Sequence, residues 1–213
     1  MRNLMMMVIV SLALLSGCAK EEEIVDPAPV YPDYTCLKQG NYWIYERFNI
    51  DTLGVVTPLG IFDSCYVEKD TLIHGETFAK LVKPYPYMPK VVVEFLRDSL
   101  HYLVDHTGNI RFSSEDFSSI FRTYYIVMSY GDTAYTATVE MDDINEHIAV
   151  PAGEFTTINC KTTYKVNPEF AYYTNKVANT KYAKDVGLVV ETLPMYATDP
   201  NKKERWLVRY HVN

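Results

Sequence analysis

The chain has little of what common catalytic and metal-binding signatures need. Its 213 residues include only nine glycines and four cysteines, and no glycine-rich phosphate loop occurs among them. No Cys-x-x-Cys spacing is present, so we expect no thiolate metal site. A Gly-x-Ser-x-Gly nucleophile turn and a His-Glu-x-x-His zinc motif are also missing. We therefore expect no cofactor, no bound metal and no catalytic residues of these classes.

Positive charge and long apolar runs are scarce as well. The 27 acidic residues outnumber the 20 basic ones, which gives a net charge of −7 at pH 7. No basic stripe interrupts this excess, so we expect no nucleic-acid partner. The longest apolar run extends from Leu4 to Leu15. It is too short to cross a hydrocarbon core, which needs roughly 20 apolar residues.

The N-terminal segment has the layout of a secretory signal peptide. Arg2 supplies a positive charge, the apolar run follows, and the small residues Ser16 and Gly17 come just before Cys18. The phrase Leu-Ser-Gly-Cys that ends at Cys18 resembles the lipobox of bacterial lipoproteins. That resemblance implies that the Cys18 thiol receives a diacylglyceryl group, that the chain is cut before Cys18, and that the new N-terminus is acylated. Several acyl chains, such as palmitate, together hold a protein stably on a membrane. A plain secretory signal with a chance cysteine, or an uncleaved helix, is the alternative.

The residues after Cys18 are predicted to form a tether. Lys20 is followed by three glutamates. This phrase resembles the surface-export signal of Bacteroidetes lipoproteins, whereas the simplest interpretation is a solvated, charged linker. Prolines between Ile24 and Asp33 favour an extended spacer. The resemblance implies a lipid-anchored protein at the outer membrane, displayed on the cell surface, with the periplasmic face as the alternative.

The sequence thus divides into a signal peptide (residues 1–17), an acidic and proline-rich tether (18–34) and one domain (35–213). The domain is long enough to bury a core without covalent staples. It is rich in tyrosine, with 18 Tyr in the chain beside 9 Phe and 2 Trp. Aromatic side chains suit a pleated, half-buried surface.

Alternation of apolar and polar residues predicts a mainly β fold. In the last segment, Trp206, Val208 and Tyr210 alternate with Arg205 and Arg209. Turn signals separate short segments of this kind, and no helix of crossover length lies between them. We expect a single domain of antiparallel strands that form a curled sheet or a partly closed barrel or sandwich. One short helix is expected near residues 113–122, where serines could cap it and two acids suit its first turn.

Three phrases resemble Bacteroidetes lipoproteins of unknown function, in the same order. They are residues 40–45 (GNYWIY), 150–155 (VPAGEF) and 182–189 (YAKDVGLV). The likeness spans most of the chain from Gly40 onward. It implies a fold family and no reaction, because the phrases fall at turns and strand starts. Asp185 stands where the phrase is expected to have a small residue such as glycine.

Three cysteines remain besides Cys18, namely Cys36, Cys65 and Cys160. Export permits disulfides, so the sequence is compatible either with free buried thiols or with a single disulfide bridge. Of the three pairings, Cys65 with Cys160 is slightly favoured, because both fall in predicted strands whereas Cys36 lies at the domain edge.

The densest set of metal-ligating side chains runs from Asp142 to His147. Its spacing is not that of an EF-hand loop, which needs glycine at the sixth position and glutamate at the twelfth. A solvated acidic turn between strands is therefore expected there.

These observations favour a non-catalytic interaction or structural module, held at the membrane by its lipid anchor, that contacts a protein or a glycan. The alternative is a carrier whose curled sheet encloses a lipid or other apolar ligand. A glycan-active enzyme that uses a pair of carboxylates is a remote alternative.

Overall fold

The computed structural model describes residues 29–213, apart from residues 87, 129–130 and 194–198. The predicted signal peptide, Cys18 and the tether up to residue 28 lie outside the described residues. Twelve strands and one turn of 3-10 helix make up the regular structure of the described part, and no helix in it is long and apolar enough to cross a membrane. The elements are β1 (Tyr42–Ile50), β2 (Val56–Ile73), β3 (Glu76–Pro84), β4 (Val91–Ser99), β5 (Tyr102–Asp105), β6 (Ile110–Ser113), β7 (Ile120–Val127), β8 (Thr133–Val150), β9 (Gly153–Val166), η1 (Pro168–Phe170), β10 (Lys176–Ala183), β11 (Gly187–Thr192) and β12 (Lys202–His211).

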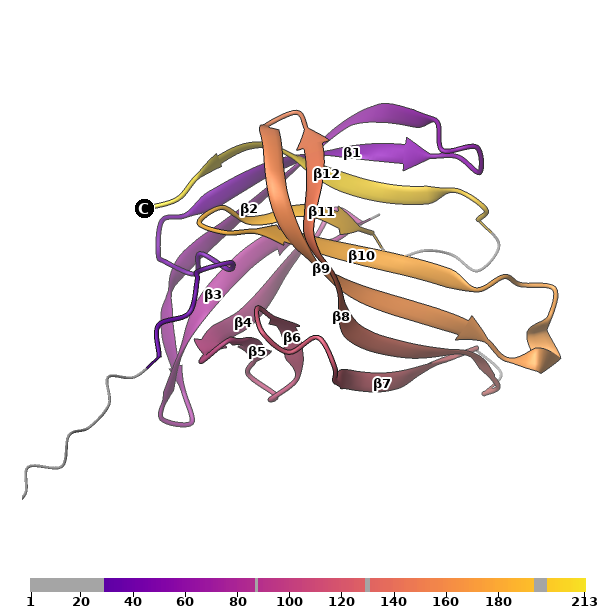
Figure 1. Cartoon of the computed structure of the whole chain (residues 1–213), viewed down its shortest axis with the longest axis horizontal. Coiled ribbons are helices and arrows are strands. Elements are labelled where there is room, and N and C mark those ends of the chain that lie inside the picture. Colours follow the sequence, from indigo (N-terminus) through magenta and orange to yellow (C-terminus); the bar gives the residue numbers. More distant parts are fainter. Residues whose placement is uncertain (1–28, 87, 129–130, 194–198) are drawn as a thin grey trace, which may run out of the picture.

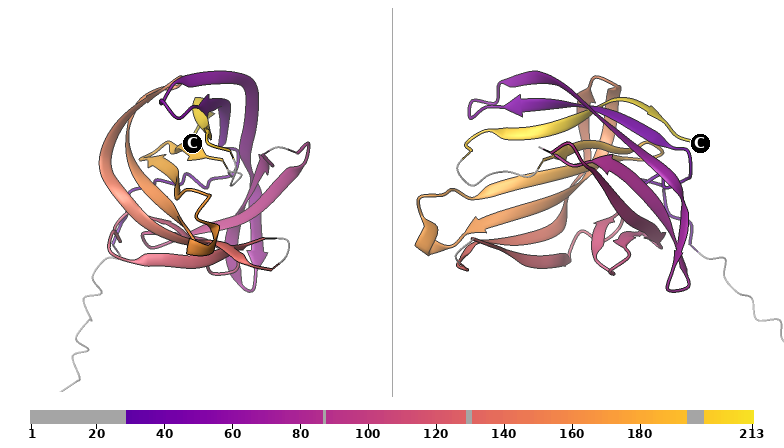
Figure 2. Two further views of the ribbon diagram at one scale, coloured as in Figure 1. Left: turned by 90° about the vertical axis from the view of Figure 1, so that its right-hand side faces the viewer. Right: turned by 180° about the vertical axis from the view of Figure 1, so that it is seen from behind.

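All twelve strands belong to one antiparallel sheet that curls into a nearly closed barrel (Figures 1 and 2). Its order is β6-β5-β4-β3-β2-β1-β12-β11-β10-β9-β8-β7. The first and last strands are neighbours, since Tyr42 pairs with His211 and Ile50 pairs with Lys202. Every other neighbour follows its predecessor directly along the chain. The predicted fold class, a single sheet of antiparallel strands curled into a partly closed barrel, is therefore confirmed.

The main apolar core lies on the inner face of the sheet, where β1, β2, β11 and β12 meet. Tyr45, Val67, Val189 and Leu207 are all at most 1% exposed. Side chains in a strand alternate between two faces, so each of these strands contributes every second residue to this core. Burying an apolar side chain of this size stabilises the fold by roughly 1.5–3 kcal/mol. The joint between the first and last strands is thus among the best-packed parts of the molecule.

The helix predicted near residues 113–122 is absent, and this prediction was wrong. Ser113 ends β6, and its hydroxyl oxygen accepts the amides of Glu115 (3.1 Å) and Asp116 (2.9 Å). The carboxylate of Asp116 in turn accepts the amides of Ser118 and Ser119, both at 3.1 Å. Side chains that satisfy nearby amides in this way stabilise turns in competition with helix. Because β7 begins at Ile120, only a bent connection remains between the two strands.

The last residues of the predicted tether are fixed to the sheet. The backbone carbonyl of Asp33 accepts the amide of Asp185 at 2.7 Å, and its carboxylate accepts the amides of Thr35 and Cys36. The Tyr34 ring lies 5.7 Å from that of Phe112, measured between centroids. The packed part of the chain therefore begins slightly before residue 35.

The hairpin of β8 and β9 is longer than the strands beside it and folds over the joint between β1 and β12. Its pairing is irregular between Asp142 and Glu146, where Asn145 adopts a positive φ of 62°. Beyond that bulge the tip crosses β12 in Figure 1, and the Ala152 amide donates to the Leu207 carbonyl at 3.0 Å. Bulges bend strands locally, so this one aims the tip at the core.

Candidate functional site

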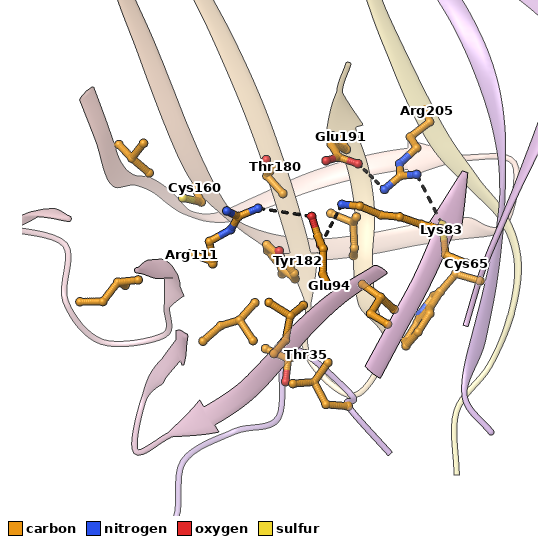
Figure 3. A pocket seen from close by; sticks show the side chains of 18 of the residues that line it. Thr35, Cys65, Lys83, Glu94, Arg111, Cys160, Thr180, Tyr182, Glu191 and Arg205 are labelled. Atoms are coloured by element: carbon orange, nitrogen blue, oxygen red, sulfur yellow. Dashed lines mark hydrogen bonds and ion pairs between the residues drawn. The ribbon is translucent and has the colours of Figure 1, made fainter. Parts of the chain in front are cut away.

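A cavity of about 170 Å³ lies inside the curled sheet, and each of the twelve strands supplies at least one residue to its lining (Figure 3). Much of the wall is apolar, with Trp43, Leu81, Leu103, Val139 and Leu188 among its members. A cavity to which every strand contributes must lie along the axis of the barrel. It is therefore a feature of the whole fold and not of one loop.

Six charged side chains also line this cavity, which is unusual for the interior of a small domain. Four are cationic and two are carboxylates; they are Lys83, Arg111, Arg122 and Arg205, with Glu94 and Glu191. They come from β3, β6, β7, β12, β4 and β11, respectively. No sequence motif marks these residues as a site. The only indication in the sequence is a charged residue on the same face of a strand as an apolar one, such as Lys83 two residues after Leu81.

One of the two carboxylates, Glu94, lies between two cations. Its Oε2 atom is 3.0 Å from Nζ of Lys83, and its Oε1 atom is 3.6 Å from Nη2 of Arg111. Nη1 of Arg111 also lies 3.5 Å from Oδ2 of Asp105, which is outside the lining. Figure 3 shows Glu94, Lys83 and Arg111 directed toward one another across the cavity. This part of the network joins β3, β4 and β6.

The other carboxylate, Glu191, forms a close ion pair with Arg205. Burial disfavours the charged form of Glu191, but the neighbouring cations Arg205 and Lys83 outweigh it and lower the pKa of this carboxyl. Arg205 is only 2% exposed. Its Nη1 atom donates to Sγ of Cys65 at 3.4 Å, and its guanidinium lies 4.9 Å from the centroid of the Tyr45 ring. Glu191 and Arg205 are therefore a charged, tightly held pair.

Arg122 has no carboxylate partner among the described residues. Its guanidinium lies over the ring of Tyr124, 4.5 Å from the centroid. Its Nε atom is buried and lacks a hydrogen-bond partner in the described part of the chain, and the same is true of Nε of Arg205. Buried donors usually have an acceptor. These two N–H groups are thus unsatisfied by the protein itself.

Neutral hydroxyls face the same space. Tyr182, Thr162 and Thr180 line the cavity, and their hydroxyl groups make no hydrogen bond within the described part of the chain. Burial raises the pKa of Tyr182 well above its ordinary value, so its hydroxyl stays protonated and can donate. Thr180 pairs with Cys160 across β9 and β10. The hydroxyls therefore adjoin Cys160 on the inner face.

Two of the cavity's arginines lie on the strands where the sheet fails to close. Arg111 belongs to β6 and Arg122 to β7, and these are the two ends of the strand order. No ladder of hydrogen bonds joins β6 to β7 in the described structure. In the described part of the chain, the hydrogen-bonded pairing of the strands around the barrel is interrupted between β6 and β7.

The cysteines that the sequence singled out are free thiols. Cys36, Cys65 and Cys160 are all buried and unpaired. The slightly favoured bridge between Cys65 and Cys160 is not formed, although both residues line the cavity. Cys65 instead contacts Arg205 from one side of the cavity. Burial raises the pKa of Cys160 to about 12, despite the opposing effect of Arg111 and Arg122, so this thiol is not a nucleophile near neutral pH.

The acidic segment from Asp142 to His147 is not the turn between strands that was predicted, but lies within β8 at its bulge. Its side chains do not converge on one point. Asp142 pairs with Lys161 at 2.8 Å and Glu146 with Lys181 at 2.6 Å. His147 shares a hydrogen bond of 3.1 Å with Thr156. In the described residues, no group of three or more His, Cys, Asp or Glu side chains is placed to hold a metal ion.

No family model and no curated protein matches the chain. Among solved structures, it is similar to an exported protein with a YmcC-like fold from Bacteroides fragilis NCTC 9343. The identity is 11%, the TM-score is 0.49, and the match covers 85% of this chain and 100% of that one. It is also similar to a lipoprotein from Parabacteroides distasonis ATCC 8503, with 14% identity, a TM-score of 0.43, and coverage of 86% and 100%, respectively.

Proposed function

We propose that this chain is a lipid-anchored protein of the cell envelope that acts as a non-catalytic interaction module at the outer membrane. The lipobox-like phrase that ends at Cys18 supports the anchor. The observation that carries the interaction role is the orientation of the domain relative to its tether. Its attachment to the tether and its most exposed apolar turn lie at opposite ends of the long axis.

Figures 1 and 2 show this arrangement. The chain enters the domain beside the C-terminus, whereas the turn between β1 and β2 lies at the far end. Leu53 in that turn is 87% exposed, and Val55 is 56% exposed. The C-terminal end of β7 also lies at this end in Figure 1, and Val127, the last residue of that strand, is 54% exposed. Exposed apolar groups held away from the attachment point favour contact with another molecule.

The charged cavity offers little support for the remote alternative of a glycan-active enzyme. Such an enzyme needs a carboxylic acid that stays protonated near neutral pH, which requires a raised pKa. The pKa of Glu191 is instead lowered by Arg205 and Lys83, against the effect of burial. Glu94 lies in ion-pair contact with Lys83 and within 3.6 Å of Arg111. Neither carboxylate is placed to deliver a proton.

The cavity also bears on the carrier hypothesis. A cavity of 150 Å³ in another protein holds a single benzene molecule, so a cavity of about 170 Å³ is too small for a lipid acyl chain. Six charged side chains in its lining do not suit a wholly apolar ligand. A lipid carrier is therefore not the function we propose.

The anchor is tested by expressing the full chain in a Bacteroidetes host and following it in membrane and soluble fractions. Cys18→Ala should move the protein to the soluble fraction and abolish labelling with palmitate. Cys36→Ala, which removes a thiol from the domain, should leave both unchanged. A Cys18→Ala variant that stays in the membrane fraction and still takes up palmitate would refute the anchor.

The interaction role is tested with a photo-activated cross-linking residue on intact cells. The probe replaces Leu53 at the far end or, as a control, Leu100, which is 69% exposed and lies beside the tether at Tyr31. We expect a discrete cross-linked product from position 53 and none from position 100. Absence of a product at position 53, or the same product at both, contradicts the proposal. Protease added to the same cells should trim the protein if it is displayed on the surface.

A further inference from the structure

The cavity inside the sheet carries a local excess of positive charge in an acidic protein. Four cationic side chains face two carboxylates in its lining, while the whole chain has a net charge of −7. Glu191 neutralises Arg205, and Glu94 is shared by Lys83 and Arg111. Asp105 offsets Arg111 from outside the lining. Arg122 is then the cation without a counter-charge among the described residues.

The same cavity contains several polar groups that lack partners. Nε of Arg205 and Nε of Arg122 are buried donors without an acceptor in the described structure. The hydroxyls of Tyr182, Thr162 and Thr180 face the cavity beside Cys160. Leaving buried donors unsatisfied is unfavourable. An anion brings several acceptor atoms and a negative charge, which suit the hydroxyl and guanidinium groups of this lining.

The two edge-strand arginines, Arg111 and Arg122, belong to the same lining as Cys160. Thr180 faces this thiol across the strand pair. Both arginines also flank the seam between β6 and β7.

We propose that this cavity is a binding site for a small organic carboxylate, held by Arg122 and Arg111 at the Cys160 end, with its apolar part against Leu103 and Val139. The volume sets the size of the ligand. Because a cavity of 150 Å³ accommodates benzene, one of about 170 Å³ accepts a carboxylate whose apolar part is about the size of a benzene ring. Apolar walls around a few convergent polar groups are the usual form of a small-molecule site.

The test uses the full chain purified in detergent and titrated with benzoate in a calorimeter. We expect saturable binding, and at least about tenfold weaker binding of benzamide, a neutral molecule of the same shape, because a hydrogen bond to a charged group is worth more than one to a neutral group. Inorganic phosphate, which has no apolar part, should bind more weakly than benzoate. Equal affinity for benzamide would refute the role of charge, and equal affinity for phosphate would refute the role of the apolar wall.

The placement of the carboxylate is tested with variants. Arg122→Gln should weaken benzoate binding at least about tenfold, whereas Arg209→Gln, which removes the same charge from an exposed position on β12, should leave it unchanged. Circular dichroism confirms that each variant is folded. If Arg122→Gln does not fold, Arg122→Lys keeps the charge and should retain most of the affinity, while Tyr182→Phe should reduce it several-fold.

Two results would overturn the proposal. One is the absence of saturable benzoate binding to the folded wild-type chain. The other is a folded Arg122→Gln or Tyr182→Phe variant that binds benzoate as tightly as wild type. Neither result bears on the anchor or on the contacts of the far end, which the cross-linking and fractionation experiments measure separately.

Discussion

At the scale of single residues, the sequence phrases singled out above meet in one place. Trp43, from the first phrase, donates its indole N–H to the carbonyl of Val186, in the third, at 2.6 Å. Ala152 and Phe155, from the second phrase, pack against the same core. The three phrases are far apart in the sequence but adjacent in the fold. Residues of all three segments thus contribute to the packing of one core.

Backbone conformation explains two positions of the third phrase. Asp185 has a positive φ of 59° and Gly187 one of 95°. Glycine adopts such angles freely, whereas asparagine and aspartate do so more readily than other residues. Asp185 therefore fills a position that favours glycine without losing the turn.

The first prediction concerns Gly187. A Cβ atom at this residue would lie 3.1 Å from two atoms of the Trp43 ring, and the positive φ adds backbone strain. We expect Gly187→Ala to lower the free energy of unfolding by about 2–4 kcal/mol, measured by urea denaturation. Gly60→Ala is the control, since φ is also positive there but no atom lies within 4 Å; it should cost about 1 kcal/mol. Equal losses would show that the Trp43 contact is unimportant.

The second prediction concerns the buried pair of Glu191 and Arg205. Glu191→Gln leaves Arg205 without its counter-charge, so we expect a loss of about 3 kcal/mol in the free energy of unfolding near pH 7. Glu68→Gln is the control, because Glu68 forms only an exposed ion pair with Lys80. That change should cost less than about 1 kcal/mol.

The pH dependence of this effect follows from the lowered pKa of Glu191. A carboxyl whose pKa is lower in the folded state contributes stability above its unfolded value, near 4.5, and loses it as the pH falls through the folded value. The difference between wild type and Glu191→Gln should therefore shrink as the pH is lowered from about 6 to about 3. A difference that stays constant over this range would contradict an ionised, paired Glu191.

At the scale of elements, β8 both pairs within the barrel wall and, in its second part, packs against the core. The first part of β8 pairs with both β7 and β9, whereas the part after the bulge pairs with β9 alone. Ile148, Val150 and Phe155 in the free part pack against the core. The hairpin tip is therefore part of the folded core although it projects beyond the neighbouring strands.

The third prediction tests this role of the hairpin. Phe155→Ala should lower the free energy of unfolding by about 2 kcal/mol, because its half-buried ring packs against the core. Ile144→Ala, in the same hairpin but at a side chain that is 55% exposed, should cost less than about 0.5 kcal/mol. Hydrogen exchange should show faster exchange at the Ala152 amide in the first variant only. Equal effects would mean that the tip does not dock on the core.

At the scale of the whole molecule, local sequence pattern predicted the strands, their antiparallel arrangement and a curled, partly closed sheet, but not which face of each strand is inside. Alternation in a strand distinguishes its two faces without saying which face is inside. Arg205 was placed on the polar face of the last segment, and this face proves to be interior, since Arg205 is 2% exposed. The pairing of β1 with β12 encloses it, and that contact joins opposite ends of the domain. For this reason the charged cavity could not be foreseen.

The helix predicted near residues 113–122 is absent for a related reason. Ser113 to Asp116 carry the side chains of a helix start, and the same oxygens also satisfy turn amides. The pairing of Ile120 and the residues after it with β8 decides between the two outcomes. That pairing depends on a distant segment, which a local pattern does not contain.

The last prediction uses the three buried thiols as reporters of the whole fold. Cys36, Cys65 and Cys160 are at most 5% exposed, and burial raises the pKa of Cys36 and of Cys160 to about 12. In a Cys18→Ala chain near pH 8, a bulky aromatic disulfide reagent should therefore react with none of them until the protein unfolds, and with all three in denaturant. Native labelling should then proceed at the rate of unfolding. A single reactive thiol in denaturant would instead show that a disulfide had formed. The chain with Cys18 intact should also give three thiols, because the thioether bond to the diacylglyceryl group that we propose consumes the fourth, and a count of four would mean that Cys18 is unmodified.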